Sequence, residues 1–382
     1  AALLTGRYPH SVGVPELASQ TPRGVVPVLA LTHEAITIPE ALKPAGYHSI
    51  AVGKWHLGFG EANLPRTHGF DEFWGSLLGT PNFSQPKETY HNEQPITVHG
   101  HYTDVLTDKA VEYLRAHDSS QPLFLYLLYN APHYPLEAPP ELVVKYRRRF
   151  PDRGFFAAYA AMIEQLDTGI GRVLATLQER EMAENTLVVF TSDNGPSAEP
   201  QALGADGADY SNGPLREYKF STHEGGLRVP FIARWPGRIP AGLVRHEAAV
   251  MMDLLPTFLE TAGMRPAADH EIHGESILPL LTGGRYQRER AIHWETRMNA
   301  AVLAGEWKLV HQYWNPGPFL YHIGDDPGEH RDLAAQHPEK VAELLALHER
   351  WKVRHYPDPV PRALTKSSYA FPELARERTS FP

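Results

Sequence analysis

Short apolar runs rich in β-branched and aromatic residues alternate along much of this chain with longer helical patterns. The runs that read as strands are residues 48–52, 123–129, 186–191 and 230–234. The helical patterns have apolar residues three and four apart and span residues 38–45, 104–116, 154–181 and 252–262. Because polar residues follow the strand-like runs, the alternation predicts an α/β fold with a mainly parallel central sheet flanked by helices.

The pattern changes after about Gly284, where short strand-like runs follow one another closely. These runs are residues 291–295, 300–303, 307–312 and 319–322, and a helical pattern follows at 338–355. They predict a small antiparallel sheet with a C-terminal helix packed on it, followed by a Pro-rich tail that wraps the surface. Since 382 residues exceed what one core usually holds, we expect an α/β catalytic domain at 1–284 and a small α+β subdomain with the tail at 285–382.

Charge and composition exclude several classes of protein. The formal net charge is −9 and cationic residues are mixed along the chain, so no basic stripe indicates a nucleic-acid partner. The longest apolar run, residues 123–129, is far shorter than the roughly 20 residues of a membrane-spanning helix. The chain has no cysteine, which rules out disulfides and thiolate metal sites within it.

Asp193 and Asn194 are candidate metal ligands. They follow an apolar strand-like run, and the carboxyl ends of strands line the ligand crevice of an open α/β sheet. Carboxylate and amide oxygens side by side suit a divalent cation. The alternative is an ordinary turn, since Asp-Asn-Gly is a common turn sequence.

Lys54 and His56 are candidate anion-binding residues, since they also follow a strand-like run. In an extended chain, residues two apart point the same way, so both side chains could donate to one anion. The alternative is an exposed lysine and a structural histidine.

His133 and Lys219 complete the candidate set. His133 lies between Pro132 and Pro135 after the apolar run that ends at Tyr129, where it could protonate a leaving oxygen. Lys219 precedes Gly225-Gly226 in a segment that implies a close backbone approach, and its amine could reach an oxyanion. The alternatives are a surface histidine and a glycine turn that leads into a strand.

Taken together, these segments resemble the type I, formylglycine-dependent sulfatases, the arylsulfatase family of the alkaline phosphatase-like superfamily. The resemblance rests on Leu4-Thr-Gly-Arg7-Tyr-Pro-His10, Gly53-Lys-Trp-His-Leu-Gly58, Asn130-Ala-Pro-His133, Ser192-Asp-Asn-Gly195, the stretch from Lys219 to Pro230, Asp253-Leu-Leu-Pro-Thr257 and Asp326-Pro-Gly-Glu329. It implies a Ca²⁺ or Mg²⁺ cofactor bound by Asp193 and Asn194. It assigns sulfate binding and proton transfer to Lys54, His56, His133 and Lys219, and support of the nucleophile's helix to Arg7.

The resemblance also implies a formylglycine nucleophile, which we expect upstream of Ala1. In the family, a hydroxyl of the hydrated formylglycine attacks sulfur, the ester oxygen leaves with a proton, and the sulfated intermediate then eliminates sulfate. His56 would be the base for elimination, and His133 with Lys219 would serve the leaving group. We therefore expect an N-terminally incomplete sulfatase that is inactive as a fragment and lacks an interior strand of its sheet, which would leave apolar edges exposed.

The expected substrate is a sulfated small molecule or sulfated carbohydrate, and the family resemblance implies a periplasmic, secreted or lysosomal location. Two alternatives stay open at this point. One is a phosphonate or phosphate ester hydrolase of the same superfamily. The other is a non-catalytic remnant that binds an anion or a glycan.

Overall fold

The computed structural model describes residues 1–15, 29–77, 82–84, 86, 88–197 and 212–356. These residues form two compact units. The first holds the described residues up to Thr191 together with 231–288, and the second holds 192–197, 212–230 and 289–356. The segment that carries Asp193, Asn194 and Lys219 is thus grouped with the C-terminal sheet. The domain division at residue 284 stays a prediction, and the tail at 357–382 lies outside the described residues.

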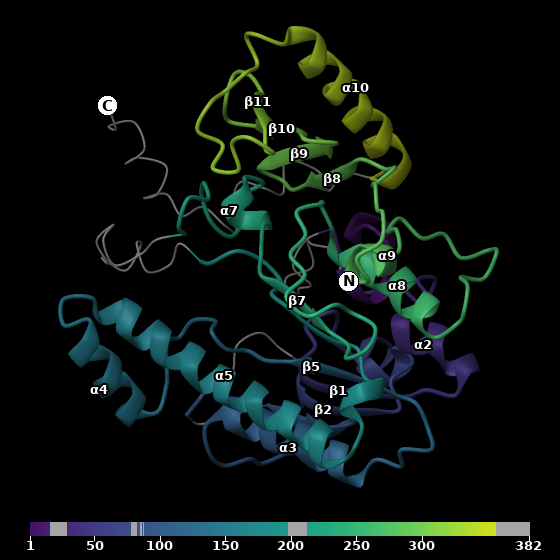
Figure 1. The fold of residues 1–382 in the computed structure, drawn as a ribbon, viewed down its shortest axis with the longest axis vertical. Helices are drawn as coiled ribbons and strands as arrows, with labels where there is room; N and C mark the ends of the chain where they lie inside the picture. The colour runs from purple at the N-terminus through teal and green to yellow at the C-terminus, as the bar shows by residue number, and fades with distance from the viewer. Residues whose placement is uncertain (16–28, 78–81, 85, 87, 198–211, 357–382) are drawn as a thin grey trace. The chain divides into compact units, whose positions relative to one another are not determined.

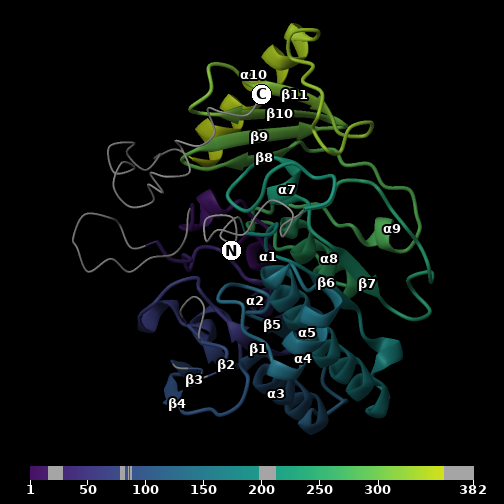
Figure 2. The ribbon, with the colours of Figure 1, turned by 90° about the vertical axis from the view of Figure 1, so that its left-hand side faces the viewer.

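A five-stranded sheet forms the centre of the first unit. Its strands are β1 (His48–Lys54), β2 (Glu72–Ser76), β3 (Thr89–His91), β4 (Gln94–Ile96) and β5 (Leu123–Leu128), in the order β4-β3-β2-β1-β5. The three longer strands are parallel, whereas β3 and β4 extend the sheet beyond β2 as an antiparallel edge (Figure 2). The predicted α/β fold with a mainly parallel central sheet is confirmed.

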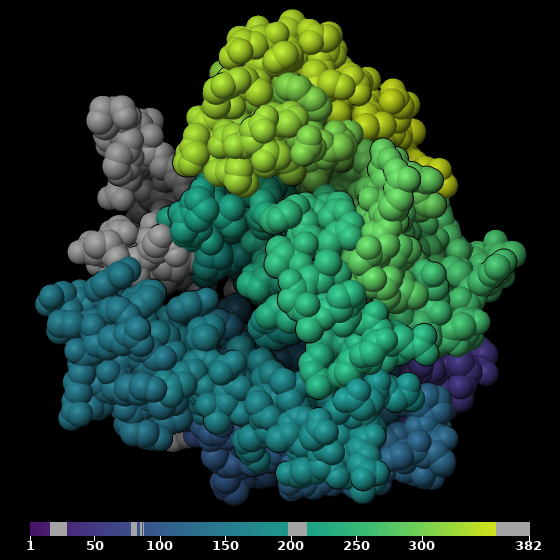
Figure 3. Space-filling view, in the orientation of Figure 1, coloured from purple at the N-terminus to yellow at the C-terminus, as the bar shows by residue number. Residues whose placement is uncertain are grey.

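Helices cover both faces of this sheet, as the continuous apolar sequence of β1 requires. Ile50 and Val52 pack in one cluster with residues of α3 (Tyr102–Ala116) and α5 (Gly154–Glu179), and Ala51 packs in the opposite cluster. That second cluster contains residues of α1 (Ala2–Thr5), α2 (Ile38–Leu42) and α8 (Leu254–Thr261). Helix α4 (Pro140–Arg149) packs on α5, and both form part of the surface in Figure 3.

Strands β6 (Val188–Thr191) and β7 (Phe231–Arg234) differ from expectation. They pair with each other as a separate antiparallel sheet and not with β5. An antiparallel pair satisfies its inter-strand hydrogen bonds locally, so the two strands form a sheet without a further neighbour. Among the described residues, β5 therefore pairs on one edge only, with β1.

The second unit is built on a four-stranded antiparallel sheet, as predicted. Its strands are β8 (Ile292–Glu295), β9 (Asn299–Ala304), β10 (Trp307–Gln312) and β11 (Phe319–His322), in the order β11-β10-β9-β8. Helix α10 (Pro338–His355) packs on one face through Leu309, and the one-turn helix α7 (Glu224–Leu227) lies at the other face (Figure 1). Side chains alternate along β10, so Lys308 and Gln312 point toward the segment that carries α7.

The remaining helical elements are short. They are α9 (Leu278–Leu281) and single 3₁₀ turns at Pro9–Val12, Lys43–Ala45, Glu61–Asn63, Pro65–His68, Ala183–Asn185 and Met251–Asp253. No helix in the described part of the chain is both long enough and apolar enough to cross a membrane.

Candidate active site

Lys54 is the last residue of β1, at the carboxyl edge of the parallel strands. The strand ends beside β5, where Gly53 lies opposite Leu128. Gly53 has φ +121°, and a Cβ there would lie 1.9 Å from the Leu128 carbonyl oxygen. Only glycine allows this approach, so the sequence Gly53-Lys54 fixes where the lysine leaves the sheet.

His56 does not continue the extended chain, which corrects one sequence argument. Its φ is +51°, in the left-handed region, and its backbone N–H donates to the Leu77 carbonyl at 3.2 Å. Since the strand ends at Lys54, the rule that residues two apart share a direction does not apply to Lys54 and His56. Left-handed non-glycine residues are uncommon and cluster at functional sites. The backbone conformation of His56 therefore favours a functional role for this residue, independently of its sequence motif.

His133 follows β5, the neighbour of β1, so it leaves the same edge of the sheet as Lys54. The peptide bonds Ala131–Pro132 and Tyr134–Pro135 on either side of it are cis. Its backbone N–H donates to the Asn130 carbonyl at 2.9 Å, and its Nδ1 lies 2.6 Å from the Tyr134 carbonyl oxygen. A carbonyl oxygen only accepts, so Nδ1 carries the proton, and Nε2 is the nitrogen that can exchange a proton with a substrate.

Asp193 and Asn194 lie in the second unit, where the structure joins their turn to the Lys219 segment. The Gly195 N–H donates to the Gly226 carbonyl at 3.0 Å, and the Lys219 N–H donates to the Pro196 carbonyl at 2.8 Å. A Cβ on Gly195 would lie 1.9 Å from the Gly225 carbonyl oxygen. The glycines thus allow the turn that carries Asp193 and Asn194 to approach the segment that carries Lys219.

The described residues do not form a complete divalent-cation site. Asp193 is exposed, and the Asn194 amide nitrogen donates to the Gly195 carbonyl at 2.8 Å. Ca²⁺ takes six to eight oxygen ligands, and no group of three or more potential His, Asp or Glu ligands occurs in the described residues. Asp193 and Asn194 would therefore supply only part of the ligand set of a Ca²⁺ or Mg²⁺ ion.

Two non-glycine residues with positive φ flank Lys219. Glu217 has φ +62° and Phe220 has φ +75°. The Glu217 carboxylate accepts hydrogen bonds from the Ser221 hydroxyl and from the Gln312 side-chain amide of β10, the latter at 3.1 Å. The Lys219 Nζ lies 5.6 Å from the centre of the Phe220 ring. Side-chain contacts thus hold the backbone around Lys219 in an unusual conformation.

Arg7 lies just after α1, in the first unit. Its guanidinium Nη2 is 3.4 Å from a Glu271 carboxylate oxygen, and the neighbouring Gly6 carbonyl accepts from the backbone of His273 and Gly274. These contacts anchor the turn after α1. The role predicted for Arg7 in supporting the nucleophile's helix stays a prediction, as does the formylglycine expected before Ala1.

Residue-level sequence reasoning missed a buried polar cluster in the second unit, formed by His223, Glu224, Lys308 and Glu329. The motif 326–329 was recognised, but nothing in it indicated a partner 105 residues earlier in the chain, where the Glu224 N–H donates to Glu329. The signal that could have revealed the cluster is a lysine at a position of β10 where an inward-facing apolar residue is expected.

Comparison with known protein families identifies the family of this chain. The family model described as Sulfatase matches residues 1–264, and the model described as N-sulphoglucosamine sulphohydrolase, C-terminal, matches residues 218–353. This chain belongs to the sulfatase family. The predicted function, hydrolysis of a sulfate ester, is thereby confirmed, and sulfatases as a family use a formylglycine and a metal ion.

Individual relatives agree with this assignment. The N-acetylgalactosamine-6-sulfatases of Canis lupus familiaris and Homo sapiens are 32% and 31% identical to the chain. The matches cover 94% and 91% of this chain, and 77% and 74% of the relatives. The crystal structure of Ps i-CgsB in complex with k-i-k-neocarrahexaose is 29% identical, with a TM-score of 0.81 over 92% of this chain and 80% of that one.

Proposed function

We propose that this sulfatase removes the sulfate group from a sulfated carbohydrate, with Lys54, His56, His133 and Lys219 as its anion-binding and proton-transfer residues. The observation that carries the catalytic assignment is the placement of Lys54 and His133. Lys54 ends β1 and His133 follows β5, and these two strands are parallel neighbours. Ligands of open α/β sheets bind at this edge.

Each residue has a distinct role in the proposal. Sulfuryl transfer places negative charge on peripheral and leaving oxygens, so the amines of Lys54 and Lys219 stabilise that charge. His133 holds its Nδ1 proton on the Tyr134 carbonyl and donates from Nε2, as an imidazolium, to the departing ester oxygen. His56 acts as the base that accepts the hydroxyl proton released when sulfate is eliminated. Asp193 and Asn194 would contribute oxygen ligands to a Ca²⁺ or Mg²⁺ ion that polarises the sulfate.

Two comparisons support a carbohydrate as the substrate. The relatives in dog and human act on an N-acetylgalactosamine 6-sulfate, as their names state. The similar crystal structure holds neocarrahexaose, a sugar. A concentrated cationic site also suits a chain of net charge −9, because its long-range field repels an anionic substrate.

The role of His133 is tested by replacing it with alanine. General acid–base catalysis contributes about 10²–10⁴-fold to a rate, so kcat for a sugar 6-sulfate should fall by about that factor in His133→Ala, measured on protein that carries its formylglycine nucleophile. The dissociation constant for inorganic sulfate should change by less than about threefold, because the lysines remain. His99→Ala, at an exposed histidine, is the matched control and should leave both quantities unchanged. An unaltered kcat in His133→Ala would remove this residue from the mechanism.

A further inference from the structure

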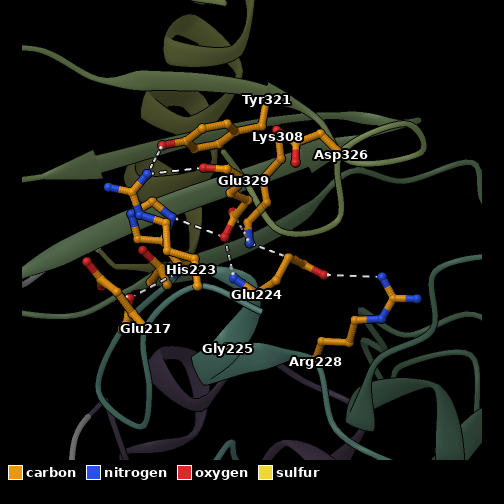
Figure 4. Close-up of polar contacts among 12 residues, drawn as sticks. Glu217, His223, Glu224, Gly225, Arg228, Lys308, Tyr321, Asp326 and Glu329 are labelled. Atoms are coloured by element: carbon orange, nitrogen blue, oxygen red, sulfur yellow. Dashed lines mark hydrogen bonds and ion pairs between the residues drawn. The ribbon is translucent and has the colours of Figure 1, made fainter. Parts of the chain in front are cut away.

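The segment that carries Lys219 is attached to the C-terminal sheet by side-chain contacts that include the following three. The first is the bond from Gln312 of β10 to the Glu217 carboxylate. The second is a bond from the Asn299 amide of β9 to the Phe220 carbonyl, at 3.1 Å. The third is the buried cluster of His223, Glu224, Lys308 and Glu329 shown in Figure 4. Lys219 thus lies in a loop whose conformation is set by residues far away in the sequence.

Glu329 is the centre of the buried cluster (Figure 4). One of its carboxylate oxygens accepts from the Glu224 backbone N–H at 2.7 Å and from the His223 Nδ1 at 3.1 Å. Its other oxygen lies 3.0 Å from the Lys308 Nζ, which also donates to the Glu224 carboxylate at 2.6 Å. The side chains of Glu329, Lys308 and His223 are fully buried.

The cluster is balanced in charge. Lys308 and Arg228, whose Nη1 lies 3.9 Å from Glu224, oppose the carboxylates of Glu224 and Glu329. Burial alone would raise the pKa of the Glu329 carboxyl, but the hydrogen bond from His223, the charge of Lys308 and the hydrogen bond from the Glu224 N–H outweigh it and lower that pKa. Glu329 is therefore ionised at neutral pH, so its carboxylate attracts the Lys308 amine and accepts charge-assisted hydrogen bonds from His223 and the Glu224 N–H.

The backbone shows that these contacts hold the loop in an unfavourable conformation. Seven described non-glycine residues have positive φ, and three of them, Glu217, Phe220 and Glu329, belong to this loop and its anchors. Such a conformation is energetically unfavourable and persists only where surrounding contacts enforce it. Buried ion pairs add little net stability compared with apolar residues of the same size, but they fix geometry. Both facts indicate that the buried cluster positions the loop and does not only stabilise the fold.

We infer that Glu329 is a positioning residue, whose carboxylate, paired with Lys308, fixes the loop that presents Lys219 to the substrate's sulfate group. The inference rests on the proposed function for the role of Lys219. The attachment of the loop by Glu329 does not depend on that role. A small displacement of a catalytic group can cost about 10²-fold in rate, so this anchor sets activity without touching substrate.

The test is hydrogen exchange on the whole protein, comparing wild type with Glu329→Gln. The neutral amide removes the charge that balances Lys308 and Arg228, and it can accept from Glu224 or His223 with only one oxygen. The Lys219 and Gly225 amides, which donate to Pro196 and Arg216, should then exchange at least tenfold faster. The amides of β9 and β10 should exchange as before. Glu339→Gln, at an exposed glutamate of α10, is the matched control and should change neither set.

A second readout reports on the position of the Lys219 amine itself. Inorganic sulfate should protect Lys219 from acylation in the wild type, and Glu329→Gln should weaken that protection at least fivefold, while the exposed Lys43 reacts equally in both. If Glu329→Gln does not fold, Glu329→Asp decides, because it keeps the charge but draws the carboxylate back from Lys308 and the Glu224 N–H, and it should speed exchange at Lys219 at least threefold. Unchanged loop exchange and unchanged protection would overturn the inference. Loss of turnover in Lys219→Ala tests the proposed function separately, so the two can fail independently.

Discussion

At the scale of the residue, the clearest pH dependence belongs to His68. Its ring is fully buried, stacks on His33 with centroids 4.6 Å apart, and has no hydrogen-bond partner on either nitrogen among the described residues. Burial, and secondarily the nearby His33, lowers the pKa of His68 to about 4. The unfolded chain, with a histidine pKa near 6.5, takes up this proton first as the pH falls.

Stability should therefore decrease as the pH is lowered from about 6.5 to about 4. The contribution of His68 to this slope is about 1.4 kcal/mol per pH unit. His68→Phe, which keeps an aromatic ring against His33, should remove that contribution and leave stability at pH 7.5 within about 1 kcal/mol. Urea unfolding at several pH values measures both. A slope in His68→Phe equal to that of the wild type would show that His68 is not the group responsible.

A pair of glutamates tests whether the positive φ at Glu217 is maintained by its contacts. Glu181 and Glu217 have φ of +56° and +62°, but within the described part of the chain only Glu217 of the two has carboxylate hydrogen bonds, to Ser221 and Gln312. Glycine relieves the backbone in both cases, so Glu181→Gly, after the end of α5, should stabilise the protein by about 0.5–1 kcal/mol. Glu217→Gly should give no such gain, because it loses two hydrogen bonds. Equal stabilisation in the two variants, measured by urea unfolding, would mean that the Glu217 contacts contribute nothing.

At the scale of the element, the β6–β7 pair exposes apolar side chains on one face. Phe190 and Ile232 are cross-strand partners and are 37% and 62% exposed. Exposed apolar strands favour association with other chains. Ile232→Thr should therefore lower concentration-dependent self-association, measured by analytical ultracentrifugation, and change the free energy of unfolding by about 0.5 kcal/mol or less.

The matched change Ile50→Thr shows what the same substitution does at a covered position. Ile50 of β1 is 2% exposed and packs against the helices of its cluster. Ile50→Thr should therefore lower the free energy of unfolding by about 1–3 kcal/mol and should not reduce self-association. A large loss of stability in Ile232→Thr would mean that the β6–β7 face is covered in solution.

Most long elements could be predicted from the sequence because each has its own periodic pattern. The ranges predicted for β1, β5, α5 and α10 agree with the structure to within two residues at each end. Strands β2, β3 and β4 and helix α4 were not predicted. Strands β3 and β4 have three residues each, which are too few to show alternation. The pairing of β6 with β7 could not be derived either, because strand periodicity says which face is buried but not which strand lies alongside.

At the scale of the whole molecule, sequence motifs indicate which residues are candidates for the site. The pairing of the strands explains the position of some of these residues but not of all. Parallel pairing of β1 and β5 brings Lys54 and His133 to one edge of the sheet, as the sequence order of strand and motif predicts. The attachment of the Lys219 loop to β10 and Glu329 could not be predicted. It depends on contacts between segments about 100 residues apart, and no local pattern encodes such contacts.

The central claim is that this sulfatase uses its cationic residues to hydrolyse a sulfate ester and not another charged ester. The measurement that tests it most directly is turnover of 4-nitrophenyl sulfate and bis(4-nitrophenyl) phosphate by the same purified protein with its formylglycine nucleophile in place, in the wild type and in Lys54→Ala. We predict that kcat/KM for the sulfate exceeds that for the phosphodiester by at least tenfold, and that Lys54→Ala lowers sulfate turnover at least tenfold while the surface variant Lys43→Ala does not. Preferential turnover of the phosphodiester, or full sulfate turnover by Lys54→Ala, would contradict the account.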